Sequence, residues 1–277
     1  MAAAGNLTVR LATAAVAVPG ILALLYVAPP WAFYCLVGPA ALVGASELFG
    51  MTHGDDKSAR ALGVLLSAVA SLSVFFFSDD PRVLLTVAVG FPLVGPLFTL
   101  ARLGDMKTAA LRACALGFGP LFVAVPLTLL ALLQRRPTAG TDRGVGWVLL
   151  AIGLAWMSDT GGYFAGRFLG KHKLYEAVSP KKTVEGSIGG LAAVVAWAVL
   201  GSFTFLKGEL PVVHAVLVAL LGGALGQAGD LAESLIKRST GVKDSGAIVP
   251  GHGGMLDRVD ALIFTSTAVY LYVIWFK

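Results

Sequence analysis

Long stretches without a charged residue are the feature that most constrains how this chain can fold. Spanning the hydrocarbon core of a bilayer as a helix takes about 20 apolar residues, and most of the stretches approach that length. They are Leu11–Ser46, Ala61–Ser78, Val83–Ala101, Ala113–Gln134, Gly144–Ser158, Gly186–Leu206, Leu210–Gly229 and Ala261–Phe276. Only 13% of the residues are charged, against roughly 25% in soluble proteins. We therefore predict a polytopic membrane protein.

The first stretch is too long for one span, and Pro29-Pro30 divides it into two. This gives about nine transmembrane helices in an all-α protein, with the termini on opposite sides of the membrane. Arg10 precedes a full-length span with no clear cleavage site, so we expect the N-terminal segment to be retained. Helices one to five (residues 1–143) are predicted to form a scaffold. Helices six to nine and their loops (residues 144–277) are predicted to form the catalytic region.

The basic residues predict the orientation. Fifteen of the 21 lysines and arginines fall on the side of the N-terminus and of the loops after even-numbered helices, and six fall on the other side. The positive-inside bias places the fifteen in the cytoplasm. We expect a bacterial cytoplasmic (inner) membrane protein with a cytoplasmic N-terminus. The net charge of +5 fits contact with anionic membrane lipids and requires no nucleic acid.

Charged residues gather in one stretch near the C-terminus, between two hydrophobic runs. Ionisable groups at the edge of a membrane are costly, so function is the default explanation for them. The segment Gly226–Asp260 holds five carboxylates and four cations: Asp230, Glu233, Asp244, Asp257, Asp260, Lys237, Arg238, Lys243 and Arg258.

A second polar segment, SDTGGYFAGRFLGKHK (Ser158–Lys173), ends the sixth predicted helix. Asp159, Tyr163 and Arg167 are spaced at i, i+4 and i+8 and share one helix face. The glycines of this segment can serve close helix packing or approach of a ligand. For Asp159 we favour a functional role over a simple pair with Arg167.

The loop SPKKTVEG (Ser179–Gly186) leads into the seventh helix. Pro180 fits the first turn of that helix with Ser179 as its cap. Lys181 and Lys182 would then lie where a helix N-terminus already attracts anions. The alternative is that these lysines have no role at the site and only contact anionic lipid headgroups.

The predicted topology brings these segments together. Helices six and eight run inward and helix nine runs outward, so Asp159, Asp230 and Asp257 all reach the cytoplasmic boundary, with Asp260 one turn after Asp257. If helix eight continues past Asp230, Ser234 and Lys237 lie on the same face. Glu47, near the cytoplasmic end of helix two, is interpreted as a solvated helix-end carboxylate.

Carboxylates without a cysteine and histidine set favour a hard cation such as Mg²⁺. The surrounding lysines and arginines suit a polyphosphate. The glycines of GHGG (Gly251–Gly254) offer backbone N–H groups to phosphate, and His252 could donate to phosphate, act as a base, or have no such role. From the residues alone we predict cytoplasm-facing, Mg²⁺-dependent phosphoryl or nucleotidyl transfer involving a lipid phosphate.

The segment S-L-I-K-R-x4-K-D-S-G-x3-P-G-H-G-G-M-L-D-R-V-D, from Ser234 to Asp260, resembles the signature of phosphatidate cytidylyltransferases (CDP-diacylglycerol synthases). The two upstream motifs, the length and the multi-span layout also resemble that family. Val184 stands where the family usually has tryptophan. The resemblance implies the reaction CTP + phosphatidate → CDP-diacylglycerol + pyrophosphate, by attack of a phosphatidate oxygen on the α-phosphorus of CTP.

The resemblance also implies site roles. Asp230 and Asp257 would hold Mg²⁺, alone or with a second cation such as K⁺, and Lys237 would join them as a catalytic residue. Asp244 and Asp260 would position the basic residues or reach the metal. The expected substrate-binding residues are Asp159, Arg167, Ser179, Lys181, Lys182, Ser234, Arg238, Lys243, Asp244, His252, Gly253, Arg258 and Asp260. A homodimer is also suggested.

Two other functions remain open from the sequence. A CTP-dependent lipid kinase, such as a polyprenol kinase, would transfer the γ-phosphate instead. A secondary transporter would also carry membrane aspartates and glycine-broken helices. The charges cluster at one face and no inverted repeat is visible, which disfavours the transporter.

Overall fold

The computed structural model describes residues 18–138, 143–246, 248 and 253–277. Among these residues, eight helices are long and apolar enough to cross a membrane. The prediction of an all-α polytopic membrane protein is therefore confirmed. The first of the nine expected spans begins within residues 1–17, outside the described residues, so the count of nine and the two-sided topology stay predictions.

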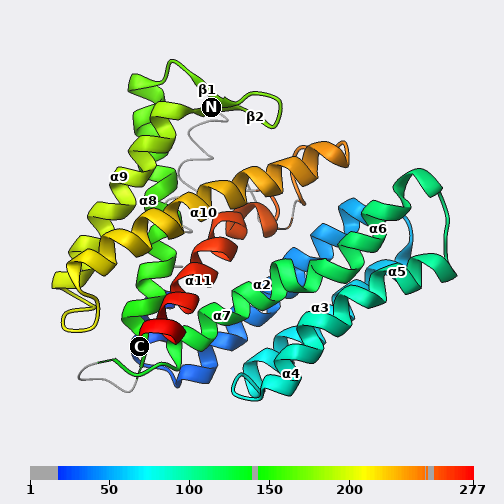
Figure 1. The fold of residues 1–277 in the computed structure, drawn as a ribbon, viewed down its shortest axis with the longest axis horizontal. Helices are drawn as coiled ribbons and strands as arrows, with labels where there is room; N and C mark the ends of the chain where they lie inside the picture. Colours follow the sequence, from blue (N-terminus) through cyan, green and yellow to red (C-terminus); the bar gives the residue numbers. More distant parts are fainter. Residues whose placement is uncertain (1–17, 139–142, 247, 249–252) are drawn as a thin grey trace.

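The helices and strands follow one another as shown in Figure 1. The first part of the chain forms α2 (Pro30–His53), α3 (Lys57–Phe76), α4 (Pro81–Leu85), η1 (Thr86–Gly90), α5 (Phe91–Ala101), α6 (Met106–Gly119), η2 (Pro120–Ala124) and α7 (Val125–Gln134). The second part forms α8 (Val145–Leu169), β1 (Lys173–Tyr175), β2 (Ser179–Thr183), α9 (Val184–Phe203), α10 (Val212–Ser239) and α11 (Leu256–Phe276).

Two spans contain one π-helical turn each, next to a proline. η1 lies just before Pro92 and η2 lies just before Pro126. A proline ring clashes with the carbonyl group four residues earlier and removes one helical hydrogen bond. Those carbonyls belong to Ala88 and Phe122, which lie inside the two π turns, so the wider turn accommodates the ring.

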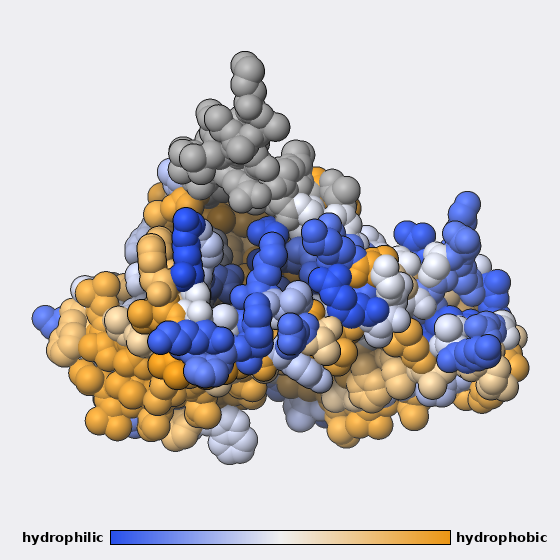
Figure 2. Space-filling model, turned by 90° about the horizontal axis from the view of Figure 1, so that it is seen from above, coloured by the Kyte–Doolittle hydropathy of each residue, from blue (hydrophilic) through white to orange (hydrophobic). Residues whose placement is uncertain are grey.

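Helix α11 joins the two parts of the chain. It packs against α10 and α8 on one side and against α7 and α2 on the other (Figure 1). One hydrophobic core includes residues from both parts, among them Phe33, Leu127, Trp147 and Leu256. The division at residue 143 into scaffold and catalytic region remains a prediction. Seen from the end that carries the β-hairpin, hydrophilic residues gather across the middle of the face, bordered by hydrophobic ones (Figure 2).

Glycines allow α8 and α9 to approach closely. A Cβ atom added at Gly161 would lie 2.7 Å from the carbonyl oxygen of Gly189, and one at Gly189 would lie 2.2 Å from the Cβ of Ala165. Such contacts leave no room for a side chain, so packing explains these two glycines. Gly162 and Gly166, on the same helix, instead line a cavity.

The expected helix start at Ser179 and Pro180 is wrong. Ser179–Thr183 forms strand β2, which pairs antiparallel with β1, and α9 begins at Val184. The cap is Thr183, whose Oγ1 accepts a hydrogen bond of 3.1 Å from the N–H of Gly186. Lys181 and Lys182 are therefore carried by a strand instead of by the first turn of a helix.

Candidate active site

A cavity of about 630 Å³ lies where α8, β2, α9, α10 and α11 meet. Its size is within the range of small-molecule sites. Ten of the residues predicted for the site line it: Asp159, Arg167, Lys181, Lys182, Asp230, Lys237, Asp244, Asp257, Arg258 and Asp260. Their roles stay predictions, but the folded chain brings these residues together from segments more than 100 residues apart.

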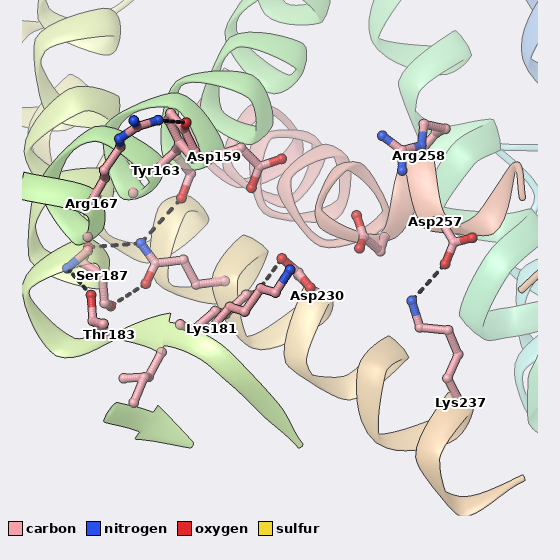
Figure 3. Close-up of a pocket in the computed structure, with 18 of the residues that line it drawn as sticks. Asp159, Tyr163, Arg167, Lys181, Thr183, Ser187, Asp230, Lys237, Asp257 and Arg258 are labelled. Atoms are coloured by element: carbon pink, nitrogen blue, oxygen red, sulfur yellow. Dashed lines mark hydrogen bonds and ion pairs between the residues drawn. The ribbon is translucent and has the colours of Figure 1, made fainter. Parts of the chain in front are cut away.

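Three aspartates from three helices share the cavity. Asp159 and Asp230 point toward its middle, between the Arg167–Tyr163 pair and the Lys237–Asp257 pair (Figure 3). Asp260 interacts electrostatically with both Asp159 and Asp230. Lys182 forms an ion pair with Asp230. Arg258 also interacts electrostatically with Asp159, so two cations face three carboxylates in this part of the cavity.

Lys237 lies between two carboxylates at the other side of the cavity. Its Nζ is 2.6 Å from Oε2 of Glu233 and 2.7 Å from Oδ1 of Asp257. The side chains are 12% exposed for Lys237, 1% for Glu233 and 7% for Asp257. The i, i+4 spacing makes Glu233 and Lys237 neighbours on one face of α10, and only Lys237 of the two lines the cavity. Glu233 therefore neutralises Lys237 from the protein interior, on the side away from the cavity.

Asp257 belongs to the first turn of α11 and is held by more than its lysine. Its Oδ2 accepts hydrogen bonds from the backbone N–H of Gly254 at 2.8 Å and of Ser245 at 3.1 Å. Gly253 has φ +83°, a conformation that favours glycine, and an added Cβ there would lie 2.9 Å from Asp257 Oδ2. Gly253 and Gly254 thus fit closely against this carboxylate.

A glutamine connects three helices along the wall of the cavity. Gln227 on α10 donates to Ser158 Oγ on α8 at 3.2 Å and to the carbonyl oxygen of Ser187 on α9 at 3.0 Å. Its Oε1 accepts a hydrogen bond from the Ser187 hydroxyl. The Gln227 amide thus makes hydrogen bonds to both α8 and α9, and this network holds the three helices in fixed relative positions.

The β-hairpin that carries Lys181 and Lys182 is anchored to α9 by Glu185. The carboxylate accepts hydrogen bonds from the backbone N–H of Lys171 at 3.0 Å and of His172 at 3.2 Å. Its Oε1 is also 2.6 Å from His172 Nδ1. This contact joins the end of α8, the hairpin and the start of α9.

Several predicted site residues lie elsewhere. Ser179 pairs with Tyr175 in the hairpin, Arg238 bonds to the carbonyl oxygen of Val242 at 3.2 Å, and Ser234 is buried in α10. These three, with Lys243 and Gly253, do not line the cavity. His252 lies outside the described residues.

Sequence reasoning did not select some residues that the structure places at the site. Tyr163, Thr183, Ser187 and Gln227 line the cavity. Tyr163 had a usable signal, since it shares a helix face with Asp159 and Arg167, and its hydroxyl accepts a 2.7 Å hydrogen bond from Arg167 Nη1. The three others are ordinary polar residues in glycine-rich sequence and gave no signal.

Glu47 is the clearest error. Its interpretation as a solvated carboxylate is wrong, because the residue is 6% exposed. Its carboxylate accepts hydrogen bonds from Ser245, Met255 and Leu256. An available signal was that Glu47 is the first acidic residue of the chain and follows a 36-residue uncharged stretch, Leu11–Ser46.

The donor set of the cavity is suited to a hard cation. Its carboxylates and hydroxyls provide oxygen ligands, and none of the described residues that line it is a cysteine or a histidine. Among the described residues, no group of three or more His, Cys, Asp or Glu is arranged to hold a metal ion. Mg²⁺ needs fewer protein ligands, because it keeps several waters and commonly binds one or two carboxylates plus substrate phosphates. The residues present therefore fit Mg²⁺ bound together with a phosphate-bearing ligand.

The cations of the cavity can bind phosphate. Lys181, Arg167 and Arg258 line it. Arg167 is hydrogen-bonded to the Tyr163 hydroxyl, and Arg258 interacts electrostatically with Asp159. Such cations can stabilise the charge of a polyphosphate and of a leaving pyrophosphate. The geometry suits transfer between phosphate groups at a membrane surface.

Comparison with known proteins gives a consistent result. The model of the cytidylyltransferase family matches residues 8–276. A phosphatidate cytidylyltransferase of Synechocystis sp. is 31% identical over 274 residues, covering 88% of this chain and 89% of that protein.

Two further relatives match over a shorter region. Phosphatidate cytidylyltransferases of Staphylococcus haemolyticus and Bacillus subtilis are 44% identical over 131 residues and 42% identical over 136 residues. These matches cover 47% and 48% of this chain, and they span about half the length of each relative, 50% and 49%.

Proposed function

Because the chain belongs to the cytidylyltransferase family, we propose that it transfers CMP from CTP to phosphatidate, giving CDP-diacylglycerol and pyrophosphate. The observation that carries the proposal is the cavity itself. It combines carboxylates and cations from α8, β2, α10, α11 and the connection between α10 and α11, in a chain similar over 88% of its length to a phosphatidate cytidylyltransferase.

In the reaction, a phosphatidate oxygen forms a bond to the α-phosphorus of CTP. The bond between the α-phosphorus and its bridging oxygen breaks, and pyrophosphate leaves. Because the lipid phosphate is itself the nucleophile, the protein has to align the two substrates and neutralise their charge. Lys181, Lys182, Arg167 and Arg258 are suited to bind the phosphates of the two substrates.

We assign Mg²⁺ to Asp230 and Asp257, where bound metal would neutralise the phosphates of CTP. Asp159 and Asp260 lie close enough to Asp230 for electrostatic interaction and would strengthen the attraction for a cation. Lys237, already at Asp257, would orient that carboxylate and contact the leaving pyrophosphate. A second cation such as K⁺ is compatible with the excess of carboxylates.

The protein is a multi-pass membrane protein, and we propose that the cavity faces the cytoplasm. The support is the positive-inside bias of the loops and the requirement for CTP, a cytoplasmic nucleotide. A homodimer is also proposed, on the basis of the family resemblance. Chemical cross-linking in intact membranes, with an unrelated membrane protein as the control, tests it.

The decisive experiment incubates purified protein in mixed micelles with phosphatidate, Mg²⁺ and CTP labelled in the cytosine ring. We expect label in the extracted lipid, its loss with EDTA, and its loss in Asp230→Asn. Asp55→Asn is the matched control, because Asp55 is exposed and does not line the cavity. Release of CDP without lipid label would indicate a lipid kinase, and no turnover at all would favour a transporter.

A further inference from the structure

Glu47 lies on α2, in the first part of the chain, yet its carboxylate contacts the segment that leads into α11. Oε1 accepts a 2.9 Å hydrogen bond from the N–H of Met255. Oε2 accepts hydrogen bonds from the N–H of Leu256 at 2.8 Å and from the hydroxyl of Ser245 at 2.9 Å. An ionised carboxylate only accepts hydrogen bonds, so three donors match it well. Its negative charge also lies at the N-terminus of α11, where the helix dipole favours it.

The surrounding glycines show how closely the segment is fitted to this carboxylate. An added Cβ at Gly246 would lie 2.5 Å from Glu47 Oε1, and one at Gly254 would lie 2.5 Å from Oε2. Neither position can hold a side chain without displacing Glu47. Gly246 and Gly254, at the two ends of the connection between α10 and α11, therefore both pack against the buried carboxylate of Glu47.

The same segment holds Asp257. Ser245 donates to both carboxylates, through its hydroxyl to Glu47 and through its backbone N–H to Asp257. The consecutive N–H groups of Gly254, Met255 and Leu256 are divided between them, the first bonding to Asp257 and the next two to Glu47. Any shift of this backbone away from Glu47 would also move the donors that orient Asp257.

We propose that Glu47 is a positioning residue for the reaction at the cavity. It fixes Ser245 and the backbone at Met255 and Leu256, and so keeps the Asp257 carboxylate and its contact with Lys237 in place. The inference rests on the proposed function. A role in packing alone would not explain why the N–H groups that bond to Glu47 directly follow the one that holds Asp257, a residue that lines the cavity.

Glu47→Gln tests the proposal at constant size. The amide can supply one acceptor, but its NH₂ group would face a backbone N–H donor, which breaks at least one of the three bonds. We expect kcat for CMP transfer to fall about 10- to 100-fold, as for the outer partners of ligand-bearing groups, while KM for both substrates changes by less than about threefold.

Ser245→Ala is the milder second variant, and it removes one donor without altering the backbone. We expect it to lower kcat severalfold, and the double variant to lose less than the product of the two single effects, because both act on one network. Gln134→Leu is the matched control. Gln134 is likewise a fully buried polar residue of the first part of the chain, bonded to the carbonyl oxygen of Leu25 at 2.7 Å, and it is remote from the cavity.

Hydrogen exchange gives a readout independent of turnover. In micelles without nucleotide, peptides that include Gly254–Asp257 should exchange faster in Glu47→Gln than in the wild type, and they should be unchanged in Gln134→Leu even if that variant melts earlier. If the wild type transfers no CMP to lipid, the proposed function fails, and the role of Glu47 in that reaction fails with it. If the wild type is active and Glu47→Gln has normal kcat and normal exchange, only the positioning role is overturned. If Glu47→Gln does not fold, a normal kcat in Ser245→Ala overturns it.

Discussion

Replacing Lys237 by methionine should destabilise the protein much more than replacing an ordinary surface lysine. Lys237→Met removes the one cation that contacts both Glu233 and Asp257, at 2.6 and 2.7 Å. Asp257 keeps two backbone donors, but Glu233 is 1% exposed and its Oε1 has no hydrogen-bond partner among the described residues. Breaking a buried ion pair by removing one partner typically costs about 3–5 kcal/mol in unfolding free energy.

A double variant separates stability from catalysis. Glu233→Gln combined with Lys237→Met removes both buried charges, and replacing a buried ion pair by neutral groups of similar volume is often close to neutral. We expect the double variant to regain most of the unfolding free energy. Neither variant should transfer CMP to lipid, because both lack the ammonium group proposed to contact the leaving pyrophosphate.

The assay is unfolding in mixed micelles at increasing denaturing detergent, followed by the fluorescence of the five tryptophans. Lys107→Met, which changes an exposed lysine outside the cavity, is the control and should unfold like the wild type. A Lys237→Met variant as stable as the wild type would refute the reasoning. So would a double variant no more stable than the single one, since Glu233 would then not depend on the charge of Lys237.

Three further predictions concern single contacts. Lys182→Met should raise KM for a phosphate substrate. It should also lower the Mg²⁺ concentration needed for half-maximal rate, because the Lys182 ammonium group and Mg²⁺ compete for Asp230. Mg²⁺ titrations at saturating substrate measure the second effect. Glu185→Gln should raise KM severalfold with little change in kcat, because the hairpin carrying Lys182 loosens, and steady-state kinetics would show a change in kcat alone if this is wrong. Asp56→Ala should cost about 1 kcal/mol of stability through the lost helix cap. A backbone hydrogen bond from Ala59 holds the pKa of Asp56 below its ordinary value. The cap contribution is therefore complete above that ordinary value and lost as the pH falls through the lowered one, so the melting temperatures of wild type and variant should converge in acid.

The spans could be predicted because their signal is local. A run of about 20 apolar residues has few alternatives to a membrane helix. The continuation of α10 to Ser239 could be given only as a condition from the sequence, because the apolar run ends at Gly229. The hairpin could not be predicted in this way. Strand β2 exists because Thr183 pairs with Lys173 ten residues away, and no property of the sequence SPKKT on its own selects that partner over a helix start.

The convergence of Asp159, Asp230 and Asp257 could be predicted from alternating helix directions. The ion-pair partners of Asp230 and Asp257 could not be predicted. Whether Lys182 or Lys237 pairs with each aspartate depends on how each helix is rotated about its axis. The surroundings of Glu47 were the hardest to predict from the sequence. Its three donors lie 198, 208 and 209 residues further along the chain. Only the packing of α2 against α11 turns an apparent surface carboxylate into a buried one.

The contacts of Gly254 also differ from the role expected for the glycines of the C-terminal motif, and Gly254→Ala tests which role is right. Sequence reasoning assigned the N–H groups of GHGG to substrate phosphate, yet the N–H of Gly254 donates to Asp257 at 2.8 Å. An added Cβ would lie 2.0 Å from Ser245 Oγ and 2.5 Å from Glu47 Oε2. If Gly254 makes room for these side chains, Gly254→Ala should lower kcat by about tenfold or more and leave KM for CTP nearly unchanged. Gly20→Ala, where a Cβ would meet nothing within 4 Å, should behave like the wild type. A large rise in KM for CTP with unchanged kcat would return Gly254 to phosphate binding, because a lost ground-state contact appears in KM whereas a displaced Asp257 appears in kcat.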